Sequence, residues 1–154
     1  MHISQTHKIV QLYQGAANAV ACDVVSLKNF HRGAIVVTHT GSADTDLVLT
    51  VKEATAVAGG GQTVANNVDI YADVDAGTTS DVLVRQTAAK TYTIDTGVAP
   101  NQVVVFEIDP DALSAGFDCV YLDDSGGNAS NTVNITFIGV PRYPGLPLAS
   151  AITD

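Results

Sequence analysis

Short runs in which every second residue is apolar recur along most of this chain, and turn-forming residues separate them. The clearest run covers residues 132–137, where Val, Ile and Phe alternate with Thr and Asn, and residues 46–52 repeat the pattern. Side chains of a β-strand point alternately to the two faces of a sheet, so a period of two predicts strands with one buried face. Such strands become stable when two sheet faces cover each other.

Two further runs, residues 34–39 and 102–108, are apolar on both faces. Strands with this pattern are expected at the centre of a sheet or beneath a neighbouring subunit. Weaker strand candidates lie at residues 9–12, 24–27, 68–72, 82–86, 91–94 and 119–122. Gly, Asp and Asn mark the turns between them. Roughly ten short strands at a spacing of about 8–12 residues predict an antiparallel β-sandwich or barrel.

The segment from Gly116 to Tyr143 predicts two strands joined by a Gly/Asn/Ser hairpin loop at residues 125–128, followed by a proline-rich exit. One short helix is predicted before it. Asp109 caps this helix, Pro110 takes its first position and Gly116 closes it. A second helical turn is expected within residues 52–58.

A chain of 154 residues is long enough for one domain with a core of its own. We expect an N-terminal arm at residues 1–8, a β-sandwich at 9–143 and an extended tail at 144–154. Prolines in residues 141–147 favour extended backbone without ladder hydrogen bonds. The tail is either frayed or an arm on an adjacent subunit, where Leu146, Leu148 and Ile152 would be buried.

The charge balance restricts the partners. Sixteen acidic residues oppose seven basic ones, and the formal net charge is -9. A phosphate backbone or an anionic membrane would repel this surface, so neither nucleic acid nor a membrane is an expected partner. No apolar run approaches the roughly 20 residues of a spanning helix, and the first eight residues lack the features of a signal peptide.

No catalytic, cofactor-binding or metal-ligating constellation stands out, and we expect none. Cys22 and Cys119 are isolated, which favours two buried thiols over a single disulfide. Four aspartates lie within residues 69–81, but Val84 stands where a calcium loop needs its bidentate Glu. Another kind of calcium site stays open. Glu53 and Glu107 could supply two carboxylates for glycoside hydrolysis, although nothing in the sequence brings them together.

Several segments together resemble the head-associated proteins of tailed bacteriophages and prophages. They are residues 23–30, 33–39, 44–54, 116–121 and 138–143, so the resemblance spans most of residues 20–143. It implies a jelly-roll-like sandwich that binds the outer surface of a capsid as a cement or decoration protein. It implies no catalytic residue.

The expected partners are therefore the major capsid protein and further copies of this chain, as a homodimer or homotrimer. The candidate interface residues are Val103, Val105, Arg142, Tyr143, Leu146, Leu148 and Ile152. Val103 and Val105 are equally good candidates for a second core layer. The alternative function is a receptor- or glycan-binding module of a phage tail or fibre, for which an exposed aromatic cluster would be expected.

Overall fold

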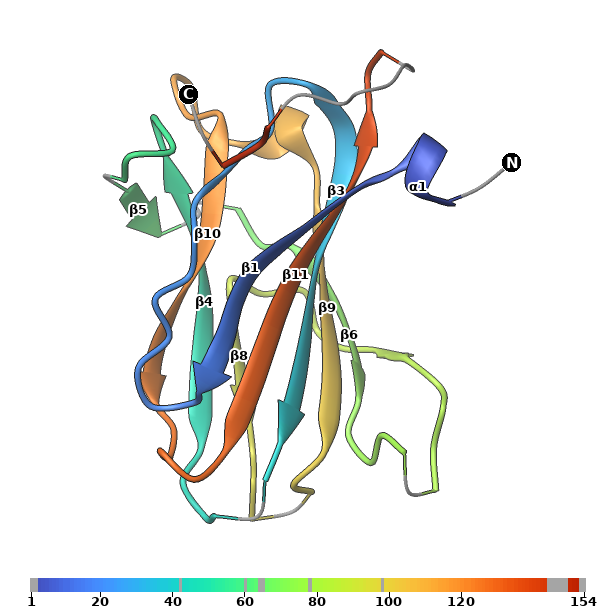
Figure 1. Ribbon diagram of the computed structural model, residues 1–154, viewed down its shortest axis with the longest axis vertical. Helices are drawn as coiled ribbons and strands as arrows, with labels where there is room; N and C mark the ends of the chain where they lie inside the picture. The colour runs from blue at the N-terminus through green and yellow to red at the C-terminus, as the bar shows by residue number, and fades with distance from the viewer. Residues whose placement is uncertain are drawn as a thin grey trace.

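Two antiparallel β-sheets face each other in the structure (Figure 1), a computed structural model that describes residues 3–41, 43–59, 61–63, 66–77, 79–97, 99–143 and 150–152. The described chain contains one turn of α-helix, α1 (Ile3–Thr6), and one 3-10 helix, η1 (Pro110–Ala112). The prediction of an all-β antiparallel sandwich with a short helix is confirmed. Neither of the helices that the structure describes is long enough to cross a membrane.

The larger sheet has six strands, in the order β1, β11, β3, β9, β6, β7. Their bounds are β1 Lys8–Ala16, β11 Thr132–Pro141, β3 Phe30–Thr40, β9 Gln102–Ile108, β6 Asp69–Asp73 and β7 Val84–Arg85. The two runs that are apolar on both faces became β3 and β9. Both have a neighbour on each side, so their prediction as central strands is confirmed.

The smaller sheet has five strands, in the order β2, β10, β4, β5, with β8 also paired to β4. Their bounds are β2 Val25–Ser26, β10 Cys119–Gly126, β4 Leu47–Ala54, β5 Gly61–Thr63 and β8 Thr91–Ile94. β8 pairs with residues 47–50 of β4 and β5 pairs with residues 52–54. The two short strands therefore share one edge of β4.

The order of the strands is that of a jelly roll. Successive strands alternate between the two sheets, first from β1 to β4 and again from β8 to β11. Two sheets with this connectivity form the double Greek key of jelly-roll domains. The remaining strands, β5 to β7, are an insertion between β4 and β8, and β6 and β7 widen the larger sheet beyond β9. The jelly-roll expectation is confirmed.

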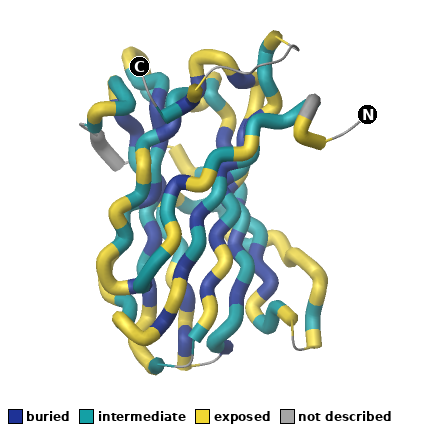
Figure 2. Tube along the Cα trace, viewed as in Figure 1, coloured by how far each residue is buried: buried dark blue, intermediate teal, exposed yellow. Residues whose placement is uncertain are grey.

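The predicted alternation appears directly in the burial of the strands (Figure 2). The inward-facing residues of the two clearest runs are fully buried in the core between the sheets: Leu47, Leu49, Val51, Val133, Ile135 and Phe137. Each strand therefore presents one apolar face to the opposite sheet, which is what holds the two sheets together.

An aromatic pair packs at the end of the core where β3 begins and β11 ends, which is the upper end in Figure 1. The rings of Phe30 and Phe137 meet edge to face, with centroids 5.2 Å apart and an interplanar angle of 77°. Gly33 on β3 and Gly139 on β11 lie directly opposite each other in the register. Both are buried beneath the rings, and a Cβ at either would meet Phe137. The two glycines thus leave the space that the aromatic pair occupies.

The hairpin predicted at residues 125–128 is wrong. The loop does join β10 to β11, but β10 pairs with β2 and β4, whereas β11 pairs with β1 and β3. The loop therefore crosses from one sheet to the other. Alternation shows which face of a strand is buried, but strands that pair and strands that face each other across a core share that pattern.

The predicted helices differ from the observed ones. Asp109 does cap η1, since its side chain accepts a hydrogen bond from the backbone N–H of Asp111. The helix ends at Ala112 rather than near Gly116, which lies in a later turn with φ of 88°. The helical turn expected within residues 52–58 is wrong, because β4 continues to Ala54 and pairs on both sides.

The C-terminal residues that the structure describes return to the sandwich. The carbonyl of Ala151 accepts a hydrogen bond from Ser26 N at 2.7 Å, and its side chain is buried in the core. Ile152 packs against that core as well. The distal end of the predicted tail thus lies beside β2, at an edge of the smaller sheet.

Candidate functional site

The outer face of the six-stranded sheet carries a cluster of small apolar side chains. They lie on the three central strands, and we call them the outer patch: Ala34, Val36, Val103, Val105 and Ile138. The register places Val36 beside Val105 and Ala34 beside Ile138. All five are only partly buried, and no helix or strand of the described chain lies across them (Figure 1).

The outer patch is also uncharged across its middle. One row of cross-strand neighbours runs Thr136, Val36, Val105, Tyr71. Ionised side chains border the patch: Glu107 lies beside Ala34 in the register, and Arg85 follows Tyr71 at the end of the row. A sheet face with an uncharged, apolar centre on a chain of net charge -9 marks a protein–protein contact surface better than a solvated one.

Exposed apolar residues continue the outer patch toward the upper end of the sandwich. Ile9 pairs with Ile138 in the register and is 52% exposed, and Val140 on β11 is 40% exposed. Beyond the end of β11, Tyr143 is 77% exposed. The apolar surface therefore extends from the middle of the sheet to the point where the chain leaves it.

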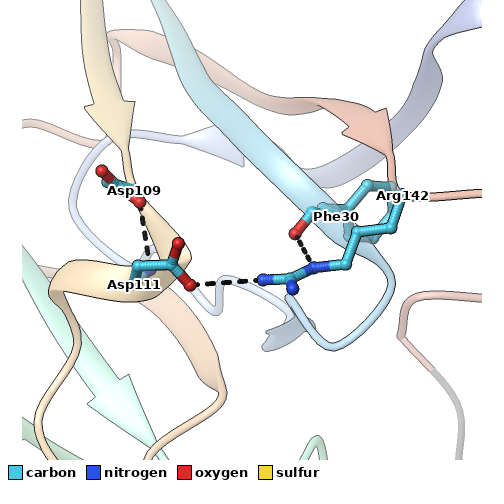
Figure 3. A network of polar contacts seen from close by, with 4 residues as sticks. All are labelled: Phe30, Asp109, Asp111 and Arg142. Carbon is cyan, nitrogen blue, oxygen red and sulfur yellow. Dashed lines mark hydrogen bonds and ion pairs between the residues drawn. The ribbon is translucent and has the colours of Figure 1, made fainter.

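A polar network holds that exit point in place (Figure 3). Arg142 donates from Nε to the carbonyl oxygen of Phe30 at 2.7 Å, and its Nη2 lies 3.4 Å from Asp111 Oδ1. The backbone N–H of Arg142 donates to the carbonyl of Asn29 at 2.8 Å. Arg142 thereby ties the end of β11 to the start of β3 and to η1, and it sets where Tyr143 emerges.

The structure brings some of the predicted interface residues together. Val103 and Val105 share the outer patch, so they face outward and do not form a second core layer within this chain. Tyr143 borders the upper extension of the patch. Leu146 and Leu148 lie outside the described residues. Arg142 and Ile152 contact their own sandwich, and a role for either in an interface stays a prediction.

The sequence interpretation did not include Ile138 and Val140 in the surface. Their alternation simply continues the run at residues 132–137, with Gly139 between them on the buried face. Extending the period of two to Pro141 would have found both residues. Tyr71 could not be found in this way, because only the pairing of β6 with β9 places it beside Val105.

A cavity of about 350 Å³ opens at the upper end of the sandwich. The residues that line it are Arg32, Val51, Asn66, Asn67, Val68, Asp69, Glu107, Ile108, Asp109, Ala112, Leu113 and Val120. Glu107 lines the cavity, but Glu53 does not. The Glu53 carboxylate is buried and accepts a hydrogen bond from Ser114 N at 3.1 Å. The structure thus does not bring the two glutamates into one cleft.

The acidic cluster on β6 and the following loop is engaged in local contacts. Asp69 pairs with Arg85 at 2.7 Å, and this contact holds the pKa of Arg85 above its ordinary value. Asp73 accepts a hydrogen bond from the backbone N–H of Asp75. Among the described residues, no three His, Cys, Asp or Glu side chains are grouped as a metal ion would require.

Both cysteines are free thiols; Cys119 is buried, as expected, whereas Cys22 is only partly buried. Burial raises the pKa of Cys22 from 9.0 to about 11. Burial, with a further contribution from Asp118, raises the pKa of Cys119 to about 12. A thiol is nucleophilic only as the thiolate, so neither cysteine is activated near neutral pH.

His39 is buried on β3 and donates from Nδ1 to the carbonyl of Pro100 at 2.8 Å. Its neighbour Gln102, directly opposite on β9, donates from Nε2 to the carbonyls of Asp95 and Ala99. The two side chains together hold the loop that precedes β9. This is a structural arrangement, because all three hydrogen bonds end on carbonyl groups of the chain's own backbone.

Solved structures of other proteins have a fold similar to that of this chain. The prophage-derived protein YomS of SPBc2 has a similar structure, with a TM-score of 0.51 and 11% sequence identity, over 87% of this chain and 92% of YomS. A protein of sacbrood virus of honeybee matches with a lower TM-score of 0.42 and 10% identity, over 98% of this chain and 83% of the viral one. No family model and no curated protein matches the sequence. The chain therefore shares its fold with a prophage-derived protein over 87% of its length.

Proposed function

We propose that this chain is a non-enzymatic structural protein of a phage virion, which binds the outside of the capsid shell and stabilises contacts between major capsid subunits. The observation that carries the proposal is the uncharged outer patch on a jelly-roll sandwich. The likeness to a prophage-derived protein supports a phage origin.

The charge of the chain supports a position outside the shell. Packaged DNA makes the capsid interior strongly negative, so a protein of net charge -9 is disfavoured there. On the exterior, acidic margins and an apolar centre fit a capsid surface with basic and apolar positions. Electrostatic attraction of this kind accelerates encounter, and the apolar contact then provides the affinity.

The outer patch also fits self-association. Protein oligomers are mostly closed and symmetric, and a two-fold contact uses the same patch on both copies. A face centred on Val36 and Val105 offers such a self-complementary apolar surface. We infer a dimer or trimer on a symmetry axis of the shell, in which the patch contacts either a second copy or the capsid protein.

The test is binding to purified shells that lack this protein. The wild-type chain is expected to co-sediment with the shells and to form a dimer or trimer in light scattering. Val105→Lys places a charge in the centre of the outer patch, so shell binding or self-association is expected to be lost. The change costs little stability, because the position is partly exposed and a lysine can extend its amine into water.

Val48→Lys is the matched control. Val48 is also a partly exposed valine on a central strand, but it points outward from the smaller sheet. This variant is expected to bind as the wild type does. Monomeric wild-type protein without shell binding, or equal behaviour of the two variants, would contradict the proposal.

The cavity at the upper end favours a second candidate, a glycan-binding module of a tail or fibre. Its lining includes Arg32, Asn66, Asn67 and Glu107, which can form hydrogen bonds to hydroxyl groups. The residues that line it include no aromatic side chain on which a sugar could stack. Binding on a glycan array that is lost on Glu107→Ala would favour this candidate over the capsid protein.

A further inference from the structure

The two sheets of the sandwich differ in width, and the wider one has an uncovered end. β6 and β7 extend the six-stranded sheet beyond β9, and β7 is its last strand. Figure 1 shows the yellow-green segment around β7 standing away from the body of the sandwich, and Figure 2 shows this segment as largely exposed.

This overhang exposes large apolar side chains. Val82, Leu83 and Val84 are 60%, 45% and 57% exposed, and Val74 at the end of β6 is 47% exposed. Val84 pairs with Ala72, which is buried on the inner face of the sheet. Val84 would therefore point into the core if the smaller sheet extended this far. Four exposed apolar residues around one strand mark a surface for a partner.

The backbone of β7 is oriented to accept another strand. Gln86 N donates to the carbonyl of Ile70 at 2.8 Å, so residues 70 and 86 form a hydrogen-bonded pair. In an antiparallel ladder such pairs alternate with non-bonded pairs. Arg85, which lies opposite Tyr71, is in a non-bonded pair. Its N–H and C=O groups therefore point away from β6, toward the free edge.

The opposite edge of the same sheet is protected. β1 has a register shift between Gln11 and Tyr13, and such a bulge twists an edge away from further pairing. The carbonyl of Leu12 already accepts a hydrogen bond from Asp23 N at 3.0 Å. β7, by contrast, combines a run of exposed apolar side chains with an outward-facing backbone at Arg85.

The charges near β7 indicate which partner fits. Residues 69–86 contain four aspartates but only one basic residue, Arg85, and Asp69 already pairs with it. Asp81 lies just before the exposed run and is itself exposed. A second copy would bring the same carboxylates against this edge, and like charges oppose such pairing. A basic segment would be attracted.

We propose that the free edge of β7 is a strand-addition site for an extended segment of another protein, in which apolar residues alternate with Lys or Arg. The backbone of the segment pairs with Arg85, and its apolar residues cover Val82 and Val84. Its basic residues lie on the opposite face, where the ion pair with Asp69 offsets the charge of Arg85 and the exposed Asp81 attracts them. This mode of recognition uses main-chain hydrogen bonds for affinity and alternate side chains for specificity. The inference goes beyond the capsid proposal, because it specifies a partner's chemistry and holds for any assembly that supplies such a segment.

The probe is a short capped peptide that alternates Lys and Val, titrated into the full-length chain and followed by backbone amide NMR. Saturable shifts confined to residues near 82–87 are expected. A peptide that alternates Glu and Val, and a Lys/Val peptide with N-methylated central amides, are both expected to bind at least about tenfold more weakly, because they lose charge attraction or backbone donors.

Arg85→Pro and Arg85→Ala form a matched pair of variants. Both lose the ion pair with Asp69, but only proline lacks the N–H group that points to the free edge. Arg85→Pro is expected to bind the Lys/Val peptide about three- to tenfold more weakly than Arg85→Ala. If the proline variant does not fold, the N-methylated peptide tests the contribution of main-chain hydrogen bonds with the wild-type protein instead.

Three results would overturn the proposal: no saturable shifts with the Lys/Val peptide, equal binding by both Arg85 variants and both forms of the peptide, or shifts centred elsewhere. A wild-type dimer that only Arg85→Pro dissociates would also overturn it, since the occupant would then be a second copy. Val105→Lys is expected to bind the peptide as the wild type does. Loss of shell binding through the outer patch and loss of peptide binding at β7 can thus be measured separately.

Discussion

Gly139→Ala tests whether the paired glycines set the packing of the upper core. A Cβ at position 139 would lie 2.5 Å from Phe30 Cδ1 and 2.6 Å from Phe137 Cε1. Carbon atoms pack at about 3.5–4.0 Å, so the rings would have to move by roughly 1 Å. Both rings are buried in the core, which leaves them little room to move.

The magnitude follows from two opposing effects. Forcing a methyl group into a packed core costs about 1–3 kcal/mol. Replacing Gly by Ala restricts the unfolded chain and returns about 0.4–1 kcal/mol. The net effect expected for Gly139→Ala is a loss of about 1–2 kcal/mol in the free energy of unfolding. For a chain of this size, Tm should fall by about 2–4 °C for each kcal/mol.

The assay is urea unfolding followed by circular dichroism, with Gly97→Ala as control. Gly97 is exposed in the turn after β8, and the nearest atom to its added Cβ is Asp44 Oδ1 at 3.0 Å, the end of an exposed side chain. This carboxylate can move aside, so the control should change stability by no more than about 0.5 kcal/mol. Equal costs for the two variants would refute the argument from ring packing.

A double-mutant cycle with Phe30→Leu tests the cause directly. Trimming the ring frees space beside position 139, so the two changes together should cost less than the sum of their separate costs. A coupling of about 0.5 kcal/mol or more is expected for residues in contact. Additive costs would show that Gly139 is required for some reason other than Phe30.

Two further predictions concern the exit network and the thiols. Arg142→Ala should cost about 1–2 kcal/mol, since the partly buried carbonyl of Phe30 loses its donor. Asp111→Ala should cost under about 0.5 kcal/mol, because that side chain is 84% exposed; urea unfolding measures both. The raised pKa values of Cys22 and Cys119 mean that the folded state retains both protons while the unfolded thiols, near 9.0, ionise. The free energy of unfolding should therefore fall as pH rises from about 9 toward 11, and it should fall less steeply in the Cys22→Ala/Cys119→Ala variant. Ellman's reagent at pH 8 should react only with unfolded wild-type protein.

Strand positions followed closely from the sequence, because alternation is a local property. A residue such as Ile135 is buried because its neighbours at 134 and 136 are polar and face the other way. The cap at Asp109 followed for the same reason, since a cap depends only on the adjacent residues. The helical turn at residues 52–58 failed because pairing with β10 and β5 on both sides overrode a local preference.

Only some residues of the candidate site could be predicted from the sequence. Val103 and Val105 stood out because β9 is apolar on both faces, and the structure places them on the outer patch. Tyr71 joins the same row through pairing over a separation of more than 30 residues, for which the sequence holds no signal. The exposure of Val84 is a further case, since it arises from the unequal widths of the two sheets.

By itself, the sequence determined that the chain is β, where most strands lie, which of their faces are buried and that the surface is acidic. These properties depend on residue type and on spacing of a few positions. Only the tertiary structure decided which strands pair, and hence that the loop at residues 125–128 crosses between sheets, that the outer patch is continuous and that β7 is a free edge. Pairing depends on the free energy of the whole sandwich, because a strand with one apolar face can be buried equally well beside a neighbour or opposite it.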